Sequence, residues 1–285
     1  MTAIRHADPA AFLAAAAPVT ARNPAVAAFA DAWALGLLRD PPPPSERSYL
    51  ATFGAVATGI AMQRGGGAVV IDGSDPPAAT AFADDLAAEH VGLQGVAGGL
   101  DACTAFAGRW RERTGRTHVV RVRMRHHVLT AVAELPAPAG HCRAGRGEDT
   151  DWLVEQVLAF VAEAGVPETK ERIGTIVPRR VADGRYRIWE VDGERAALAG
   201  YTAAGAHGAR VGPVWTPVAR RGRGYGTALV AALSRELLAA GAPRLFLMTD
   251  VGNPTSNAIY ARIGYRPLTD LYHFDFVAPT EVGAS

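Results

Sequence analysis

The stretch that decides the fold lies at residues 220–227 and reads RRGRGYGT. It follows an apolar, strand-like run at residues 209–216 and opens an amphipathic helix expected over residues 226–240. Its alternate glycines carry no Cβ atom, so successive backbone N–H groups can face one anion. A helix N-terminus adds roughly half a positive charge at the same place. The pattern predicts a diphosphate-binding loop, and a plain tight turn is the structural alternative.

Two other phosphate-binding patterns fit this sequence poorly. A Walker loop needs Gly-Lys-Ser or Gly-Lys-Thr, and neither tripeptide is present. The dinucleotide fingerprint G-x-G-x-x-G/A fails because Thr227 or Leu229 stands at its last position. Asp250 nevertheless lies at a strand end where a ribose-binding acid would be expected, so the dinucleotide interpretation is weakened rather than excluded.

A second stretch, at residues 253–265, reads NPTSNAIYARIGY and begins where a buried strand expected at residues 245–250 ends. With it, the chain resembles the GNAT superfamily of N-acetyltransferases over residues 141–278. The loop matches the family pattern R/Q-x-x-G-x-G/A through Arg221, Gly224 and Gly226. The later stretch matches N-x-x-A/S-x-x-h-Y-x-x-x-G-F/Y through Asn253, Ser256, Ile259, Tyr260, Gly264 and Tyr265.

The resemblance implies a cofactor-binding role for three groups of residues. Main-chain groups of Val214, Trp215 and Thr216 would pair with the pantetheine arm of acetyl-CoA and hold its thioester carbonyl. The pyrophosphate would lie against the loop formed by Arg221, Gly222, Arg223, Gly224, Tyr225, Gly226 and Thr227. Asn253 and Ser256 would bind further along the cofactor, and Tyr260 would place its hydroxyl near the thioester sulfur.

These roles are chemically sensible for transfer of an acyl group to an amine. Attack on a thioester creates an oxyanion, which fixed N–H donors stabilise, and a phenol can protonate the departing thiolate. Tyr260 is the expected catalytic residue, although an aromatic on an amphipathic helix can equally be a core residue. The candidates for a general base are Asp250 and Glu190, with a water chain as the alternative. No covalent enzyme intermediate is required, so Cys103 and Cys142 need not be catalytic.

The sequence predicts two domains. Residues 141–285 form the catalytic acetyl-CoA-binding domain, with strands, a hairpin at Asp192-Gly193 and helices in the order of a mixed α/β fold. The expected fold class is α/β (α+β), a mixed, mostly antiparallel central sheet flanked by helices. Residues 1–135 loosely repeat that order, with a long alternating strand at residues 118–135, and predict a degenerate GNAT-like or accessory domain. At the position in residues 1–135 where a phosphate loop would lie, the chain has prolines and Asp75 instead. Residues 135–145, which read LPAPAGHCRAG, are the expected linker.

Composition narrows the class of partner. The 285 residues carry a formal charge of +1, which offers no positive field for nucleic acid. Two isolated cysteines and the absence of a signal peptide or an 18-residue apolar run predict a cytoplasmic protein without membrane or metal partner.

The expected function is N-acetyl transfer from acetyl-CoA by direct attack in a ternary complex. The acceptor is a small-molecule or protein amine, and the protein is a monomer or homodimer. The alternative is a non-catalytic acyl-CoA sensor.

Overall fold

A computed structural model describes residues 2–39, 48–64, 67–72, 75–89, 92–165, 168–202 and 206–278. The chain forms two compact units. Unit 1 comprises residues 1–126, 249–252 and 268–285, and unit 2 comprises residues 127–248 and 253–267. Residues 40–44, whose sequence DPPPP predicts an extended loop, lie outside the described residues, as do residues 73–74, which begin the stretch in the position of the phosphate loop in unit 1.

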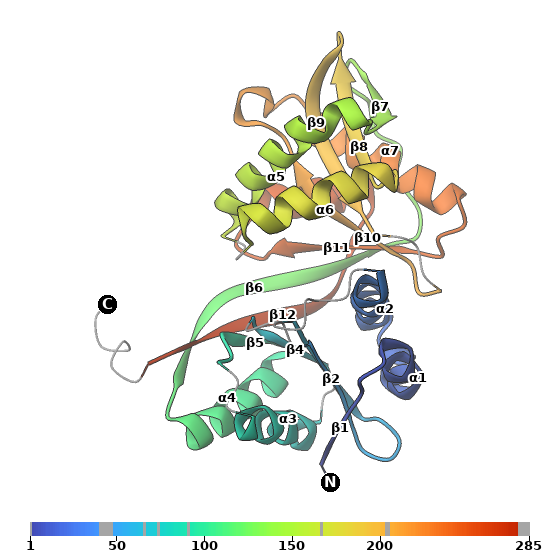
Figure 1. The fold of residues 1–285 in the computed structure, drawn as a ribbon. Helices are drawn as coiled ribbons and strands as arrows, with labels where there is room; N and C mark the ends of the chain where they lie inside the picture. The colour runs from blue at the N-terminus through green and yellow to red at the C-terminus, as the bar shows by residue number, and fades with distance from the viewer. Residues whose placement is uncertain are drawn as a thin grey trace. The chain divides into compact units, whose positions relative to one another are not determined.

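Unit 1 begins with a short strand and two helices and continues as alternating strands and helices (Figure 1). Its elements are β1 (Ala3–Arg5), α1 (Pro9–Thr20), α2 (Pro24–Arg39), β2 (Ser48–Phe53), β3 (Gly59–Arg64), β4 (Val69–Asp72), α3 (Pro76–Ala88), β5 (Gly95–Gly98), α4 (Leu100–Thr114), most of β6 (Thr117–Leu129) and most of β12 (Arg266–Val277). Strands β1 to β4 pair antiparallel, β4 and β5 pair parallel, and β12 pairs antiparallel with β5.

Alternation along the strands divides the core of unit 1 into two layers. Along β2, Tyr49, Ala51 and Phe53 pack on the side of α3 and α4, whereas Leu50 packs on the side of α1 and α2. The same alternation sends Ile71 to the first layer and Val70 to the second (Figure 1). Unit 1 is therefore a sheet covered by helices on both faces.

Unit 2 repeats this order of elements. It contains β7 (His141–Ala144), α5 (Thr150–Ala164), α6 (Lys170–Ala182), β8 (Tyr186–Val191), β9 (Glu194–Tyr201), β10 (Ala209–Trp215), α7 (Tyr225–Ala239), most of β11 (Leu245–Asp250) and α8 (Pro254–Ile263). Strands β7 to β10 pair antiparallel and β10 pairs parallel with β11. The predicted hairpin turn between β8 and β9 is confirmed, with positive φ at both Asp192 and Gly193.

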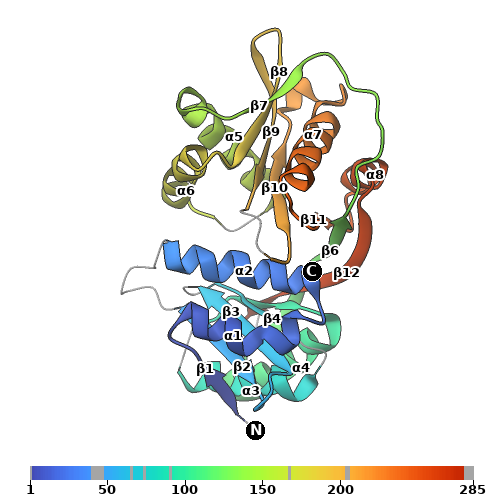
Figure 2. The ribbon, with the colours of Figure 1, turned by 90° about the vertical axis from the view of Figure 1, so that its right-hand side faces the viewer.

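Two hydrophobic layers also enclose the sheet of unit 2. Leu229 and Leu233 of α7 pack with Ala197 and Ala199 of β9 on one face. Helices α5 and α6 pack on the opposite face with Ile188, Leu198 and Trp215 (Figure 2). The mixed, mostly antiparallel sheet flanked by helices and the degenerate N-terminal repeat are therefore as expected.

The sequence analysis omitted helices α1 and α6. Helix α1 is alanine-rich and contains Pro18, which obscures a helical stripe, but Asp8 caps it by accepting from the N–H groups of Ala10 and Ala11 at 3.1 Å. Helix α6 contains Gly174 and Pro178, both poor helix formers, and Thr169 caps it through the N–H of Arg172. In both helices a side-chain cap and burial of one face outweigh unfavourable internal residues.

The boundary between the units differs from the expected domain limits of 1–135 and 141–285. The predicted linker packs within unit 2: Leu129 lies in its core and the Trp189 indole donates to the carbonyl of Ala139 at 3.0 Å. The C-terminal strand, expected in the catalytic domain, instead pairs with β5 of unit 1. Gly95 permits this pairing because a Cβ there would lie 2.2 Å from the carbonyl oxygen of Phe274. Independent folding of the two expected domains stays a prediction.

Candidate functional site

Strands β10 and β11 separate soon after they meet. Their parallel pairing involves only Ala209 with Leu245 and Arg210 with Phe246, although β10 continues to Trp215. On its other edge β10 stays paired with β9, with a register shift between Val211 and Val214. Those main-chain groups at the end of β10 that point away from β9 therefore lie beyond the pairing with β11. This is the position of Val214, Trp215 and Thr216, which the sequence pattern assigned to pantetheine.

The loop that follows β10 leads directly into the N-terminus of α7. Gly222 and Gly224 have positive φ values of 77° and 79°, a conformation that favours glycine. Gly224 is the N-cap of α7, no side chain caps this end, and the first turn holds no acidic residue. The N–H groups of Tyr225, Gly226 and Thr227 thus begin a helix whose end carries partial positive charge.

The third glycine of the loop, Gly226, packs closely against the residue that follows β10. A Cβ at Gly226 would lie 3.0 Å from the hydroxyl oxygen of Thr216, so a side chain there would press on the end of β10. The loop is thereby held against the strand edge that diverges from β11. Together they form one continuous set of main-chain donors and acceptors, which suits an extended ligand that carries amides and a phosphate.

The two arginines of the loop differ in their surroundings. Arg221 contacts the Glu163 carboxylate at 2.9 Å, donates to the Thr216 carbonyl at 3.0 Å, and lies over the Trp215 ring at 4.5 Å. Arg223 is exposed. The sequence pattern does not separate the two arginines, whereas the contacts of Arg221 do.

Helix α8 starts at the second motif. Asn253 is its N-cap, and its side-chain oxygen accepts from the N–H of Ser256 at 3.0 Å. The motif residues Asn253 and Ser256 are therefore bonded to each other in this structure. Their expected contact with the cofactor stays a prediction, and Asn253 retains its side-chain amide as a donor for it.

Tyr260 is half-buried on α8 and packs against the core of unit 2. Its ring meets that of Tyr265 edge to face, with the centroids 5.9 Å apart, and the Tyr265 hydroxyl lies 3.0 Å from that of buried Ser234. Burial raises the pKa of Tyr260 to about 12, so its hydroxyl keeps its proton at neutral pH. Such a group can act as a proton donor.

The two candidate general bases lie in different units. Asp250 is exposed, belongs to unit 1, and accepts from the N–H of Gly252 at 2.8 Å. Glu190 belongs to unit 2 and pairs with Arg143, and the hydrogen bond from Arg143 holds the pKa of Glu190 below its usual range. A carboxylate with a lowered pKa and a fixed partner is a weak base, so the contacts of Glu190 favour a structural role.

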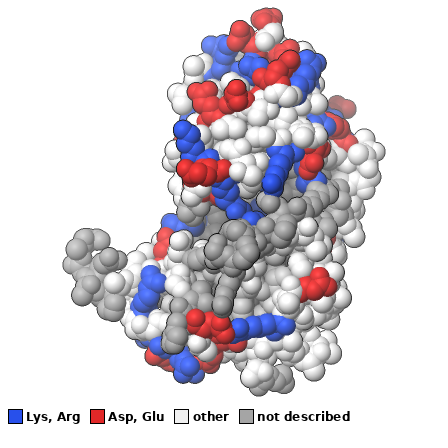
Figure 3. All heavy atoms as spheres, in the orientation of Figure 1, with Lys and Arg blue, Asp and Glu red and all other residues white. Residues whose placement is uncertain are grey.

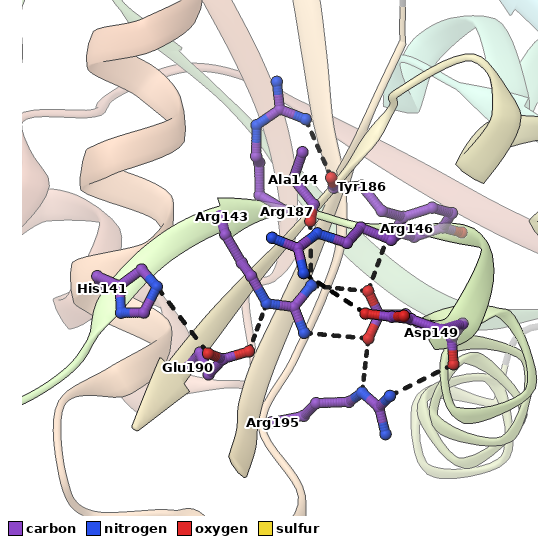
Figure 4. Close-up of polar contacts among 10 residues, drawn as sticks. His141, Arg143, Ala144, Arg146, Asp149, Tyr186, Arg187, Glu190 and Arg195 are labelled. Atoms are coloured by element: carbon purple, nitrogen blue, oxygen red, sulfur yellow. Dashed lines mark hydrogen bonds and ion pairs between the residues drawn. The ribbon is translucent and has the colours of Figure 1, made fainter. Parts of the chain in front are cut away.

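Sequence reasoning missed the ion-pair network to which Glu190 belongs (Figure 4). Its centre is Asp149, which is fully buried and contacts Arg143 at 2.7 Å and Arg195 at 2.6 Å. Burial alone would raise the pKa of Asp149, but hydrogen bonds from Arg143, the Arg146 N–H and Arg195 outweigh it and hold the pKa far below its usual range. The network joins β7, β8 and β9 to the start of α5. No spacing rule predicts it, because its members come from four separate elements.

Trp189, Trp215 and Tyr201 lie on strands of unit 2, the two tryptophans in its core and the tyrosine half-buried. Trp189 and Trp215 are buried, with 4% and 8% of their surface exposed. The indole of Trp215 donates to Gln156, and the hydroxyl of Tyr201 donates to the carbonyl of Gly184. Their polar atoms thus already have protein partners, which leaves packing as their observed role.

Neither cysteine resembles a catalytic nucleophile. Burial raises the pKa of Cys103 to about 12 and that of Cys142 to about 11, so both are thiols at neutral pH.

Within the described residues, no three His, Cys, Asp or Glu side chains gather as metal ligands. No helix in this part of the chain combines the length and hydropathy needed to cross a bilayer. On the face shown in Figure 3, basic and acidic side chains are interspersed over unit 2.

Comparisons with known proteins give a family match within the chain. The model of the acetyltransferase (GNAT) family matches residues 150–265. Mycothiol acetyltransferase of Nocardia farcinica is 36% identical over 127 residues, which cover 44% of this chain and 40% of that protein. The chain thus spans well under half the length of the curated relative that it matches.

Solved structures resemble the whole chain. A GCN5-related N-acetyltransferase from Sphaerobacter thermophilus superposes with a TM-score of 0.63 at 20% identity over 96% of this chain and 95% of its own. A tandem GNAT protein from the clavulanic acid biosynthesis pathway superposes with a TM-score of 0.64 at 17% identity, over 96% of this chain and 97% of its own. These similarities concern the fold alone, and they cover both units of the chain. Residues 150–265 therefore carry the match to the acetyltransferase (GNAT) family, and for the rest of the chain the likeness is one of fold.

Proposed function

We propose that the protein is an N-acetyltransferase that moves an acetyl group from acetyl-CoA to an amine by direct attack in a ternary complex. The observation that supports this most strongly is the divergence of β10 from β11 beside the uncapped N-terminus of α7. An extended ligand with amides along one arm and a diphosphate at its end fits that combination. The family match of residues 150–265 and the name of the curated relative support the same reaction.

Each part of the site has a role in this proposal. Main-chain groups of Val214, Trp215 and Thr216 bind the pantetheine arm and the thioester carbonyl. The backbone from Gly222 to Thr227 binds the diphosphate through its N–H groups, as helix N-termini bind phosphates elsewhere. Asn253 and Ser256 lie at the start of α8 and hold the cofactor arm beside the catalytic helix.

The chemistry requires one proton donor and one proton acceptor. Bound acetyl-CoA supplies the acyl group as a thioester, and the amine nitrogen forms the new C–N bond as the C–S bond breaks. Tyr260 gives its hydroxyl proton to the departing sulfur: its raised pKa keeps that proton in place at neutral pH, and the same shift makes the phenol a weak acid, so it donates as the negative charge on sulfur develops. Water or Asp250 accepts the proton that the amine loses. Glu190 has no part in this step, because Arg143 already engages its carboxylate.

The acceptor is an amine of a small molecule or protein. Mycothiol acetyltransferase is named for mycothiol, so related small amines stand first in a panel of acceptors. Two measurements test the proposal: calorimetric binding of acetyl-CoA, and release of free coenzyme A thiol with each amine. Binding followed by amine-dependent thiol release is the expected result. Binding without turnover across the panel would favour the alternative, an acyl-CoA sensor, and absence of binding would overturn both.

A further inference from the structure

Three contacts fix the Arg221 side chain at the edge of the diphosphate loop. One nitrogen of its guanidinium approaches both Glu163 carboxylate oxygens, at 3.0 and 2.9 Å, and another donates to the Thr216 carbonyl. The flat face of the group lies over Trp215. Glu163 stands near the C-terminal end of α5, so Arg221 links that helix to the end of β10 and to the loop.

A second contact joins the same two elements. The Trp215 indole donates to Gln156 of α5 at 3.3 Å, and the Phe160 ring of α5 meets the Trp215 ring edge to face. The strand end that carries Trp215 is thus anchored to α5 from within the core, and Arg221 adds an anchor at the surface. The loop from Thr216 to Gly222 is held at its first residue and at Arg221.

Arg223 offers the contrast within the same loop. It is exposed, and among the described residues it makes no hydrogen bond or ion pair. It lies between Gly222 and Gly224, the two residues with positive φ. Its charge is available to an incoming anion, whereas that of Arg221 is already neutralised by a carboxylate.

We propose that Arg221 is a positioning residue, held by Glu163, that fixes the diphosphate loop, while Arg223 supplies the cation that meets the diphosphate. This inference rests on the proposed binding of acetyl-CoA and assigns different tasks to two arginines of one motif. An exposed ion pair by itself contributes little free energy. The planar guanidinium, however, makes three different contacts at once, which a flexible ammonium cannot reproduce.

The first experiment examines the loop in the absence of any ligand. Amide hydrogen exchange over residues 216–224 should accelerate by about threefold to fivefold in Glu163→Ala and further in Arg221→Gln, because each removes an anchor. Glu155→Ala changes an exposed glutamate on the same helix and should leave exchange unaltered. Unchanged exchange in both anchor variants would overturn the positioning role. Because no ligand is present, this outcome is independent of the proposed function.

The second experiment measures coenzyme A affinity by calorimetry in a double-mutant cycle. Glu163→Ala should weaken binding by about threefold to fivefold in the wild type and have no effect in the Arg221→Gln background. A general loss of stability would instead weaken binding in both backgrounds and lower the melting temperature. Tighter binding in Glu163→Ala would show that Arg221 leaves Glu163 to meet the diphosphate, and would overturn the proposal.

Lysine substitutions separate charge from geometry. Arg221→Lys should weaken coenzyme A binding about as much as Arg221→Gln, since a lysine keeps the charge and loses the planar group. Arg223→Lys should bind nearly as well as the wild type, whereas Arg223→Gln should bind more weakly and with a smaller dependence on salt. The reverse pattern would exchange the two roles and overturn the proposal. If wild-type protein binds no coenzyme A, the proposed function fails, and hydrogen exchange alone decides the role of Arg221.

Discussion

The two loops that join a parallel strand to the next helix differ in length and chemistry. In unit 2, β10 ends at Trp215 and α7 begins at Tyr225, with a glycine N-cap and no acid in the first turn. In unit 1, β4 ends at Asp72 and α3 begins at Pro76, with Asp75 as N-cap. Pro76 and Pro77 have no N–H, and Asp75 carries a negative charge that repels phosphate.

The strands beside these loops differ in the same sense. In unit 2, β10 and β11 pair at two positions and then separate. In unit 1, β4 and β5 also pair at two positions, but both strands end within two residues of that pairing, and a Cβ at Gly98 would lie 2.6 Å from the Ile71 carbonyl oxygen. One fold can thus present or conceal its main-chain donors, depending on the loop and on how far the strands extend beyond their pairing.

The helix that follows completes the contrast. Seven residues after its N-cap Asn253, α8 carries Tyr260, and seven residues after its N-cap Gly99, α4 carries Phe106. Phe106 is fully buried in the core of unit 1 and has no hydroxyl. By these three criteria, the features to which we assign cofactor binding and proton donation to the thiolate lie in unit 2.

The largest expected effect concerns this tyrosine. Tyr260→Phe removes a hydroxyl and almost no volume, so acetyl-CoA affinity should change little while turnover falls by roughly 10²–10⁴. Turnover, calorimetric affinity and melting temperature on one preparation provide the measurement. Phe106→Leu is the matched change in unit 1 and should lower stability without altering turnover of the folded protein. Normal turnover in folded Tyr260→Phe would make water the proton donor.

Gly98 in unit 1 tests the close approach of β4 and β5. Gly98→Ala should destabilise the protein by about 1–3 kcal/mol, because the new methyl group meets the Ile71 carbonyl. Coenzyme A affinity of the folded variant should stay unchanged. Gly108→Ala, in a helix and with no atom within 4 Å of the new Cβ, is the control and should be neutral or stabilising. Urea unfolding measures both, and equal stabilities would contradict the close approach of the strands.

A glycine in unit 2 tests the diphosphate loop. Gly224→Glu places a side chain and a negative charge at the start of α7, and should weaken acetyl-CoA binding at least tenfold, or about 1.4 kcal/mol. Gly224→Asn, which tolerates positive φ, should have a smaller effect. Asp75→Asn in the corresponding loop of unit 1 should have none. An unaltered dissociation constant for Gly224→Glu would remove the diphosphate assignment.

The smallest expected difference between the two units concerns how the free energy of unfolding depends on pH. Burial lowers the pKa of His273 to about 4, and it also lowers the pKa values of His6 and His118, all three in unit 1. As pH falls through 6.5, the unfolded chain takes up protons before the folded one, so stability present above 6.5 is lost progressively toward pH 4. In unit 2, Asp149 has a lowered pKa and loses its contribution only below about pH 4.

Urea unfolding at pH 7.5 and pH 5 measures this effect. The free energy of unfolding should be lower at pH 5, and His273→Gln should reduce the difference. Asp149→Asn should lower stability at both pH values, because it leaves Arg143 and Arg195 without their buried partner. A free energy independent of pH over this range would contradict the lowered pKa values of these three half-buried histidines.

Much of unit 2 could be predicted because its signals are local. A hairpin needs positive φ at Asp192 and Gly193, and a helix after a buried strand needs a cap such as Asn253. Helices α1 and α6 were missed because their local signals are poor and burial decides them. The network around Asp149 was missed because ion pairs between distant segments have no sequence period.

Local sequence patterns predicted the β8–β9 hairpin, the glycine-rich loop and the helix that carries Tyr260, because each depends on residues within one or two turns of chain. Only the tertiary structure decided that β12 pairs with β5 and that residues 127–140 pack within unit 2. It also decided that Arg221 and Glu190 already have partners. Strand pairing and ion pairing join residues far apart in the chain, and many partners are compatible with the same local pattern. Packing of the whole unit selects one of them.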